Sequence, residues 1–249
     1  MFWINFIAAA GVAFFICHFT VVVGSPDQNK VVITPFWEGE INESLGLDDL
    51  LIEFSDVEEI SLKQSWLFAP KSDFKPTGVK VVWKPEELYI FAQLQDIDII
   101  SHSTDFNQRL WELGDVFETF IYFKEADVYY EFHVSPNNHL MQLRFGVDLT
   151  PDQRRLQLSG SYIVRPVVES SVWIEAARNR WYVLLRIPAS TLKPSGFFAA
   201  GDTLEFSFSR YDHSHTNKEP VLSSSSDHKE LDFHNREDWG ILYLESRSD

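Results

Sequence analysis

The chain has 249 residues and carries 37 acidic against 21 basic side chains, for a formal net charge of −16. Such a field repels nucleic acid and anionic membrane surfaces, whereas a neutral ligand such as a sugar meets no such barrier. Cys17 is the one cysteine and lies in an N-terminal apolar segment. Disulfides, thiol catalysis and thiolate metal sites are therefore excluded for the rest of the chain.

The first segment, residues 1–24, is typical of a targeting sequence. Residues 2 to 24 contain no Asp, Glu, Lys or Arg, and the stretch FIAAAGVAFFICHFTVVVG is nearly all apolar. Small and β-branched residues before Ser25 indicate a cleaved signal peptide, and roughly 20 apolar residues would also serve as an N-terminal anchor. Both interpretations predict an exported protein (secreted, periplasmic or at the cell surface) with one domain over residues 25–249.

Short β-strand patterns dominate the remainder. Pro35 marks an edge or a bend in the first strand, KPEE separates the second from the third, and RNR at 178–180 is a hairpin turn. We expect strands at 30–39, 79–83, 88–95, 116–123, 127–136, 139–148 and 162–170, on both sides of the turn within 172–192, at 202–212 and at 238–246.

Three longer segments connect these strands. Residues 41–66 are interpreted as a loop with one short helical turn, residues 101–115 as a long polar loop, and the Ser-rich residues 214–230 as a flexible surface loop. No long amphipathic helix is expected. Short strands at regular spacing with few helices predict an all-β fold, an antiparallel β-sandwich of two sheets of the jelly-roll or immunoglobulin-like kind.

The strand at 116–123 carries an acid on an aromatic face. Alternation sends Phe117, Thr119, Ile121 and Phe123 toward the core, and Val116, Glu118, Phe120 and Tyr122 the other way. Trp111 precedes the strand in the polar loop. A catalytic acid, a metal ligand and a sugar-binding platform are the three interpretations of Glu118.

The next two strands favour the platform. Tyr129, Glu131 and His133 alternate with apolar residues, and in LMQLRFG the polar Gln142 and Arg144 oppose Met141, Leu143 and Phe145. We expect the polar members of all three strands to share one outer face. Aromatic faces meet the C–H surface of a sugar ring, while carboxylate and guanidinium groups bond its hydroxyls.

Six stretches of the chain resemble, in order, the family 9 carbohydrate-binding modules. They are VKVVWKPEELYIFAQLQDIDI, LWELGDVFETFIYF, YYEFHVSPNNHLMQLRF, WYVLLRIPASTL, GDTLEFSFSRYD and FHNREDWGILYL, and together they extend over about residues 30 to 246. The blocks W-E-x-G-D-x-x-E and F-H-x-x-E-x-W-G are the most specific. The resemblance implies a sandwich of the wider DOMON-like group.

The resemblance also implies a site that clamps a terminal glucose-type ring between two aromatic side chains. Trp111 matches the first of these, and Phe233 stands where better-known modules have a Trp. Glu118 and Arg144 match the residues that bond sugar hydroxyls, and Arg210 is a further candidate for the same site. Trp239 resembles the packing aromatic before Gly240.

Other functions remain open on the sequence. Glu112, Asp115 and Glu118 lie close enough in sequence to suggest a pair of catalytic acids, and His213 with His215 suggests a metal site. The candidate site residues also have a structural interpretation. Trp111 would then cover the end of the sandwich, and Glu118 would form an ion pair with Arg144. The protein would in that case be a purely structural or protein-binding sandwich.

The sandwich modules that the chain resembles suggest two cofactors, calcium and haem. Structural calcium is possible through loop oxygens such as those of Asp96 and Asp98, but no metal ligand is assigned. Haem-binding relatives use a Met with a His or Lys. Met141 is expected in the core and His133 on the opposite face, which argues against haem.

The prediction is therefore a non-catalytic module that binds a neutral oligo- or polysaccharide. It would act in carbohydrate catabolism, with separate glycoside hydrolases as its partners, and would bind no nucleic acid.

Overall fold

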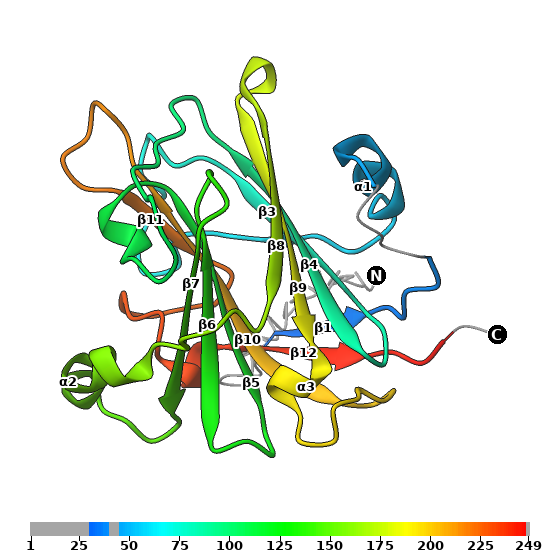
Figure 1. The fold of residues 1–249 in the computed structure, drawn as a ribbon. Helices are drawn as coiled ribbons and strands as arrows, with labels where there is room; N and C mark the ends of the chain where they lie inside the picture. Colours follow the sequence, from blue (N-terminus) through cyan, green and yellow to red (C-terminus); the bar gives the residue numbers. More distant parts are fainter. Residues whose placement is uncertain (1–29, 40–44, 248–249) are drawn as a thin grey trace, which may run out of the picture.

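The computed structural model describes residues 30–39 and 45–247, which form two sheets packed face to face (Figure 1). The predicted targeting segment, residues 1–24, lies outside the described residues. Among the residues described, no helix has the length and apolar character needed to cross a bilayer. The predicted all-β sandwich is confirmed.

One sheet has seven strands, in the order β1-β12-β10-β5-β6-β7, with β11 also paired to β10. All its pairs are antiparallel except β1 with β12, which is parallel. Its strands are β1 (Val31–Thr34), β5 (Val116–Phe123), β6 (Val128–Val134), β7 (Leu140–Gly146), β10 (Thr203–Asp212), β11 (Val221–Ser224) and β12 (Gly240–Leu244).

The other sheet has five strands in the order β2-β3-β4-β9-β8, all antiparallel. They are β2 (Ile60–Ser61), β3 (Thr77–Trp83), β4 (Glu87–Gln95), β8 (Glu169–Glu175) and β9 (Arg180–Pro188). The helices are α1 (Leu47–Glu53), α2 (Pro151–Ser161) and α3 (Ala189–Leu192), with short 3₁₀ turns η1 (Leu110–Glu112), η2 (Ala176–Arg178) and η3 (Arg236–Asp238).

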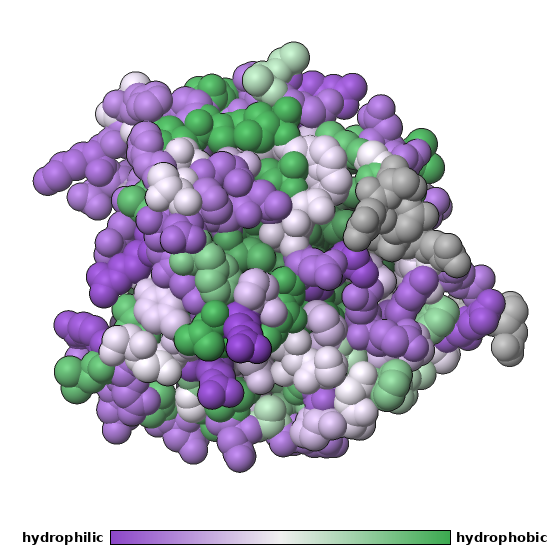
Figure 2. Space-filling view, in the orientation of Figure 1, coloured by the Kyte–Doolittle hydropathy of each residue, from purple (hydrophilic) through white to green (hydrophobic). Residues whose placement is uncertain are grey.

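The main core lies between the two sheets. Phe117, Ile121 and Phe208 of the seven-stranded sheet belong to the same buried cluster as Ile90 and Trp181 of the five-stranded sheet. Both outer faces are also covered. A second cluster, around Phe120 and Trp239, lies outside the seven-stranded sheet, and a third lies between α1 and the five-stranded sheet. In the view of Figure 2, apolar side chains show between the two sheets and polar side chains surround them.

Helix α2 has 11 residues and lies where the sequence analysis named no helix. It begins after Thr150, whose side chain accepts a hydrogen bond from the Gln153 amide while the Gln153 side chain bonds back to the Thr150 amide. Pro151 occupies the first turn, where its missing N–H costs nothing. The helix is polar, so hydrophobic periodicity did not show it, but Thr-Pro-Asp-Gln is a capping-box signature. The expected strand at 162–170 is reduced to a bridge at Tyr162 and the first residues of β8.

The Ser-rich segment corrects a second expectation. Residues 221–224 form β11, and Ser223 to Ser226 are buried rather than in a flexible surface loop. Ser224 lies 3.1 Å from Ser207 between hydroxyl oxygens, and Ser226 donates to Ser207 at 2.9 Å. Because the hydroxyls satisfy one another, a serine run can be buried against β10.

Candidate functional site

A pocket of about 600 Å³ opens on the outer face of the seven-stranded sheet. Its floor comes from β5 and β6, and its walls come from α2, Tyr211 at the end of β10, η1 and residues 231–234. Figure 1 shows α2 and the segment that leads into β12 on this side of the sheet.

Aromatic side chains form two of the walls. Trp111, half-buried in η1, lines the pocket, and its carbonyl lies 3.0 Å from His213 Nε2. Phe233 lines the pocket from the segment before η3 and is 6% exposed. Phe233 is in ring contact with Tyr211 and Phe120 at centroid distances of 6.0 and 6.4 Å.

Trp239 fixes the position of Phe233 from behind. It is fully buried, and its indole N–H donates a 2.9 Å hydrogen bond to the Phe233 carbonyl. Trp239 therefore has the packing role that the sequence indicated.

A chain of alternating glutamate and histidine side chains forms the floor of the pocket. His133 Nδ1 lies 2.8 Å from Glu118 Oε1, and its Nε2 lies 3.4 Å from Glu131 Oε2. Glu131 Oε1 in turn lies 3.0 Å from His234 Nδ1, which is also 3.0 Å from the Tyr129 hydroxyl. The first three side chains are each 3% exposed, whereas His234 is 32% exposed and reaches the open part of the pocket.

Two members of this chain, His133 and Glu131, are ionised near neutral pH. Burial alone would lower the pKa of His133, but the negative charges of Glu118 and Glu131 outweigh it and raise this pKa to about 9. Burial would raise the pKa of Glu131, but the positive charges of His234 and His133 hold it at about 2. His133 is therefore an imidazolium between two carboxylates.

Helix α2 brings a guanidinium to the rim. The Arg154 side chain is 13% exposed, donates from Nη1 to the Leu149 carbonyl at 2.8 Å and lies 3.7 Å through Nη2 from Asp232 Oδ2. These contacts orient the guanidinium and leave N–H groups for a ligand.

The structure brings three of the five predicted site residues together, namely Trp111, Glu118 and Phe233. Arg144 does not join them. The register of β6 with β7 pairs His133 with Met141, Glu131 with Leu143 and Tyr130 with Arg144. Directly paired residues share a face, so the apolar residues of β7 lie under the pocket and Arg144 points to the other side. The expectation that Arg144 and Gln142 share the polar face with Glu118 is wrong.

The same register corrects the argument against haem. Met141 and His133 are cross-strand neighbours on one face, not on opposite faces. Met141 is fully buried and His133 is held by two carboxylates, so neither side chain is placed to serve as an axial ligand.

Arg210 lies elsewhere, in a buried ionic cluster at one end of the sandwich. Its Nη2 is 2.8 Å from Asp96 Oδ2 and 3.1 Å from Asp212 Oδ1. Lys75 donates to Asp212 at 2.9 Å. Arg210 is therefore not in the pocket, and its guanidinium already has carboxylate partners.

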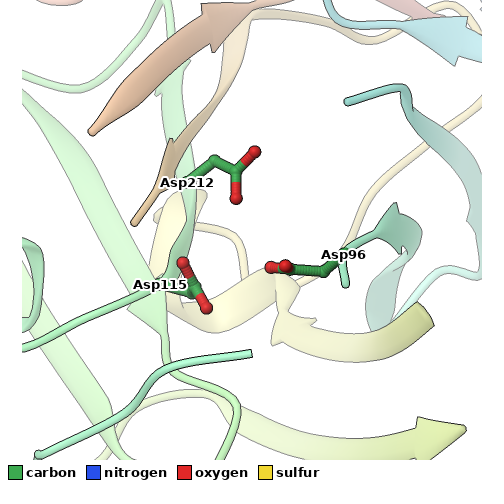
Figure 3. Close-up of side chains that lie close together, drawn as sticks. All are labelled: Asp96, Asp115 and Asp212. Atoms are coloured by element: carbon green, nitrogen blue, oxygen red, sulfur yellow. The ribbon is translucent and has the colours of Figure 1, made fainter. Parts of the chain in front are cut away.

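Figure 3 shows the carboxylates of Asp96, Asp115 and Asp212 turned toward one another. One oxygen from each lies within 4.8 Å of the others. The cluster fits a calcium ion poorly, because Arg210 and Lys75 already supply positive charge to Asp96 and Asp212. Burial and the charge of Asp96 raise the pKa of Asp115 to about 8, although it accepts hydrogen bonds from the amides of Ile100 and His213.

Several pocket residues were missed by the sequence analysis, among them Arg154, His234 and Tyr211. The capping box at Thr150 was a signal for the helix that carries Arg154. His234 stands next to Phe233 in the F-H-x-x-E-x-W-G block and could have been found there. Tyr211 is the neighbour of the buried Arg210 on β10, and no sequence pattern marked it as a site residue.

The geometry defines a two-sheet sandwich with an aromatic and ionic pocket on one outer face. The family model for the carbohydrate family 9 binding domain-like group matches residues 52–247. The chain belongs to this family. No curated protein matches the chain.

Solved structures agree with the fold. A candidate carbohydrate-binding protein from Bacteroides uniformis ATCC 8492 is 16% identical, with a TM-score of 0.64 over 88% of this chain and 100% of its own. A family 9 module from Caldicellulosiruptor kristjanssonii is also 16% identical and covers 88% of this chain. Its complex with cellotriose has a TM-score of 0.59 over 96% of its chain, and its complex with glucose 0.58 over 98%. At this identity, the likeness establishes the fold.

Proposed function

We propose that the protein is a non-catalytic module that binds the end of a neutral glycan in the pocket of Trp111 and Phe233. The pocket itself carries the proposal, because two aromatic side chains and the carboxylate of Glu118 line the same cavity, whose volume suits a small ligand. Family membership and the two sugar complexes of the C. kristjanssonii module support the same ligand class.

Each part of the pocket has a role in this proposal. Trp111 and Phe233 present apolar surface to the sugar ring, and Tyr211 extends it. Glu118 accepts hydrogen bonds from hydroxyls, while His234 and Arg154 donate. Arg154 takes the role that the sequence analysis gave to Arg144. His133 holds Glu118 and Glu131 in place.

The charge state of the floor argues against glycoside hydrolysis. A general acid needs a carboxyl whose pKa is raised so that it carries a proton. The pKa of Glu131 is instead lowered to about 2, and Glu118 is bound to the His133 imidazolium. This pair suits hydroxyl recognition better than proton transfer.

Export is a further part of the proposal and rests on the apolar residues 2–24. An exported module without its own catalytic pair would capture glycans for separate hydrolases in polysaccharide breakdown.

The test is a titration of the protein with a panel of neutral mono- and oligosaccharides, followed by tryptophan fluorescence. We expect a saturable change with at least one sugar and its loss in Trp111→Ala, with an unchanged circular dichroism spectrum. No response across the panel would contradict the proposal and indicate a sandwich without a sugar site.

A further inference from the structure

A second groove lies on the other side of the sandwich, beside β8 and β9. It has a volume of about 440 Å³, and Trp173, Leu184 and Arg186 line it. Trp173 and Leu184 belong to the cluster outside the five-stranded sheet, so this groove and the Trp111 pocket lie on different sheets. The turn between β6 and β7 closes one end, where Asn138 and Ser170 exchange two hydrogen bonds.

Trp173 is the aromatic surface of this groove. It is half-buried on β8, which is an edge strand of its sheet, and it stands opposite Tyr182 on β9. The cluster around Leu184 supports the indole from the inner side. A tryptophan held in this way offers a rigid apolar face, which stacks on a flat ligand at little entropic cost.

Arg186 provides polar groups beside Trp173. Its Nη2 bonds both carboxylate oxygens of Glu87 at 3.0 and 3.1 Å, and its Nη1 bonds Glu169 at 2.9 Å. Its Nε is buried and has no hydrogen-bond partner among the described residues. A ligand in the groove cannot reach this buried atom, but Nη1 carries two N–H groups and bonds Glu169 with one of them, which leaves a donor for a ligand. Glu169 is 73% exposed and can accept from the same ligand.

The charge of the groove selects a neutral ligand. The two carboxylates bonded to Arg186 outnumber its single positive charge, so an anion gains nothing there, and the exposed carboxylate that a cation would meet, Glu169, is already paired with Arg186. A hydroxyl-rich pyranose matches the remaining groups, because each hydroxyl both donates and accepts.

We propose that the groove at Trp173 is a second glycan-binding site, which takes a neutral pyranose ring of a polysaccharide. It does not depend on the Trp111 pocket. Because the two sites face outward from different sheets, one module can hold two chains, or two segments of one flexible chain. Binding to a polymer would then exceed binding to a short sugar through avidity, without any new contact.

The experiment follows the indole N–H signals of the ¹⁵N-labelled protein by NMR during titration with a panel of neutral oligosaccharides that includes cellotriose. Spectra of Trp173→Ala and Trp111→Ala assign the two signals. We expect both signals to shift with saturation and to follow separate binding curves. In Trp111→Ala the Trp173 curve persists, and in Trp173→Ala the Trp111 curve persists. Phe68→Ala, at a fully exposed phenylalanine outside both sites, is the control and leaves both curves unchanged.

The outcomes separate this inference from the proposed function. A Trp173 signal that no sugar of the panel moves overturns the second site, even if the Trp111 signal responds. A response at Trp173 alone supports the groove and contradicts the pocket. If the alanine variant of either tryptophan fails to fold, the phenylalanine variant at the same position removes the same indole N–H signal and assigns it, so the wild-type titration still decides the result.

Discussion

His133 lies between Glu118 and Glu131 at the floor of the pocket, and its Nδ1 is 2.8 Å from Glu118 Oε1. The pair couples the sugar-facing carboxylate to a buried positive charge. Removing the charge of Glu118 should therefore affect both ligand binding and the stability of the fold.

Glu118→Gln tests this coupling. The amide keeps the shape of the side chain but cannot hold the His133 imidazolium as a carboxylate does, so we expect a loss of about 1–3 kcal/mol in the free energy of unfolding. Sugar affinity should fall at least tenfold. Denaturant unfolding and sugar titration measure the two effects. Glu112→Gln, at an exposed pair with Arg109, is the matched control and should change neither by much.

The position of the pocket arginine gives a second prediction. Arg154→Ala should weaken sugar binding about tenfold to a hundredfold, because hydrogen bonds from charged groups contribute about 1.5–3 kcal/mol. Arg144→Ala should leave binding unchanged, since this exposed side chain lies on the other side of β7. Calorimetric titration of both variants with the same sugar shows which of the two arginines contributes to binding. The reverse result would restore the assignment made from the sequence.

Trp239 does not line the pocket, but it should hold Phe233 in the position needed for sugar binding. Trp239→Phe removes the hydrogen bond to the Phe233 carbonyl and leaves a void behind it. We expect a loss of about 1–3 kcal/mol in the free energy of unfolding and a weaker sugar affinity in the folded variant. Unchanged sugar affinity in a destabilised but folded variant would show that Phe233 keeps its place without this support.

The raised pKa of Asp115 predicts that the stability of the fold depends on pH. Burial and the charge of Asp96 raise its pKa from 3.8 to about 8 in the folded protein, so the folded state binds the proton more tightly than the unfolded chain. This contribution is fully present below pH 3.8 and is lost as the pH rises through the folded pKa.

Between pH 5 and pH 8, therefore, the Asp115 contribution to stability should fall. Asp115→Asn removes the titrating group and should flatten the profile in this range. Thermal melts of both proteins across the range provide the measurement. Parallel profiles would show that Asp115 is ionised in the folded state at all these pH values.

The sandwich and three residues of the pocket could be predicted from the sequence. Strand alternation identified Glu118 on an aromatic face, and the two tryptophan-containing blocks located Trp111 and Phe233. These signals are local, so they need no knowledge of how distant strands pair.

Arg144 shows why the rest could not be predicted. Alternation separates the two faces of a strand but does not say which one turns outward. In β7 the outward face is apolar, because α2 and the segment before β12 cover it, and Met141 and Leu143 are buried there. Arg144 is exposed on the inward side because β7 is the outermost strand of its sheet. Polar residues of a strand are usually inferred to face outward. In β7 the reverse holds, because a helix of polar sequence covers the outer face and the apolar residues of the strand pack beneath it.

The parallel pairing of β1 with β12 affects how the protein is made. Val31 pairs with Ile241, so the first described strand has its partner near the other end of the chain. The ribosome must synthesise the whole segment between these two residues before this ladder can form. Until then β1 carries unpaired amides and carbonyls along both edges, and its closure is a late, non-local event.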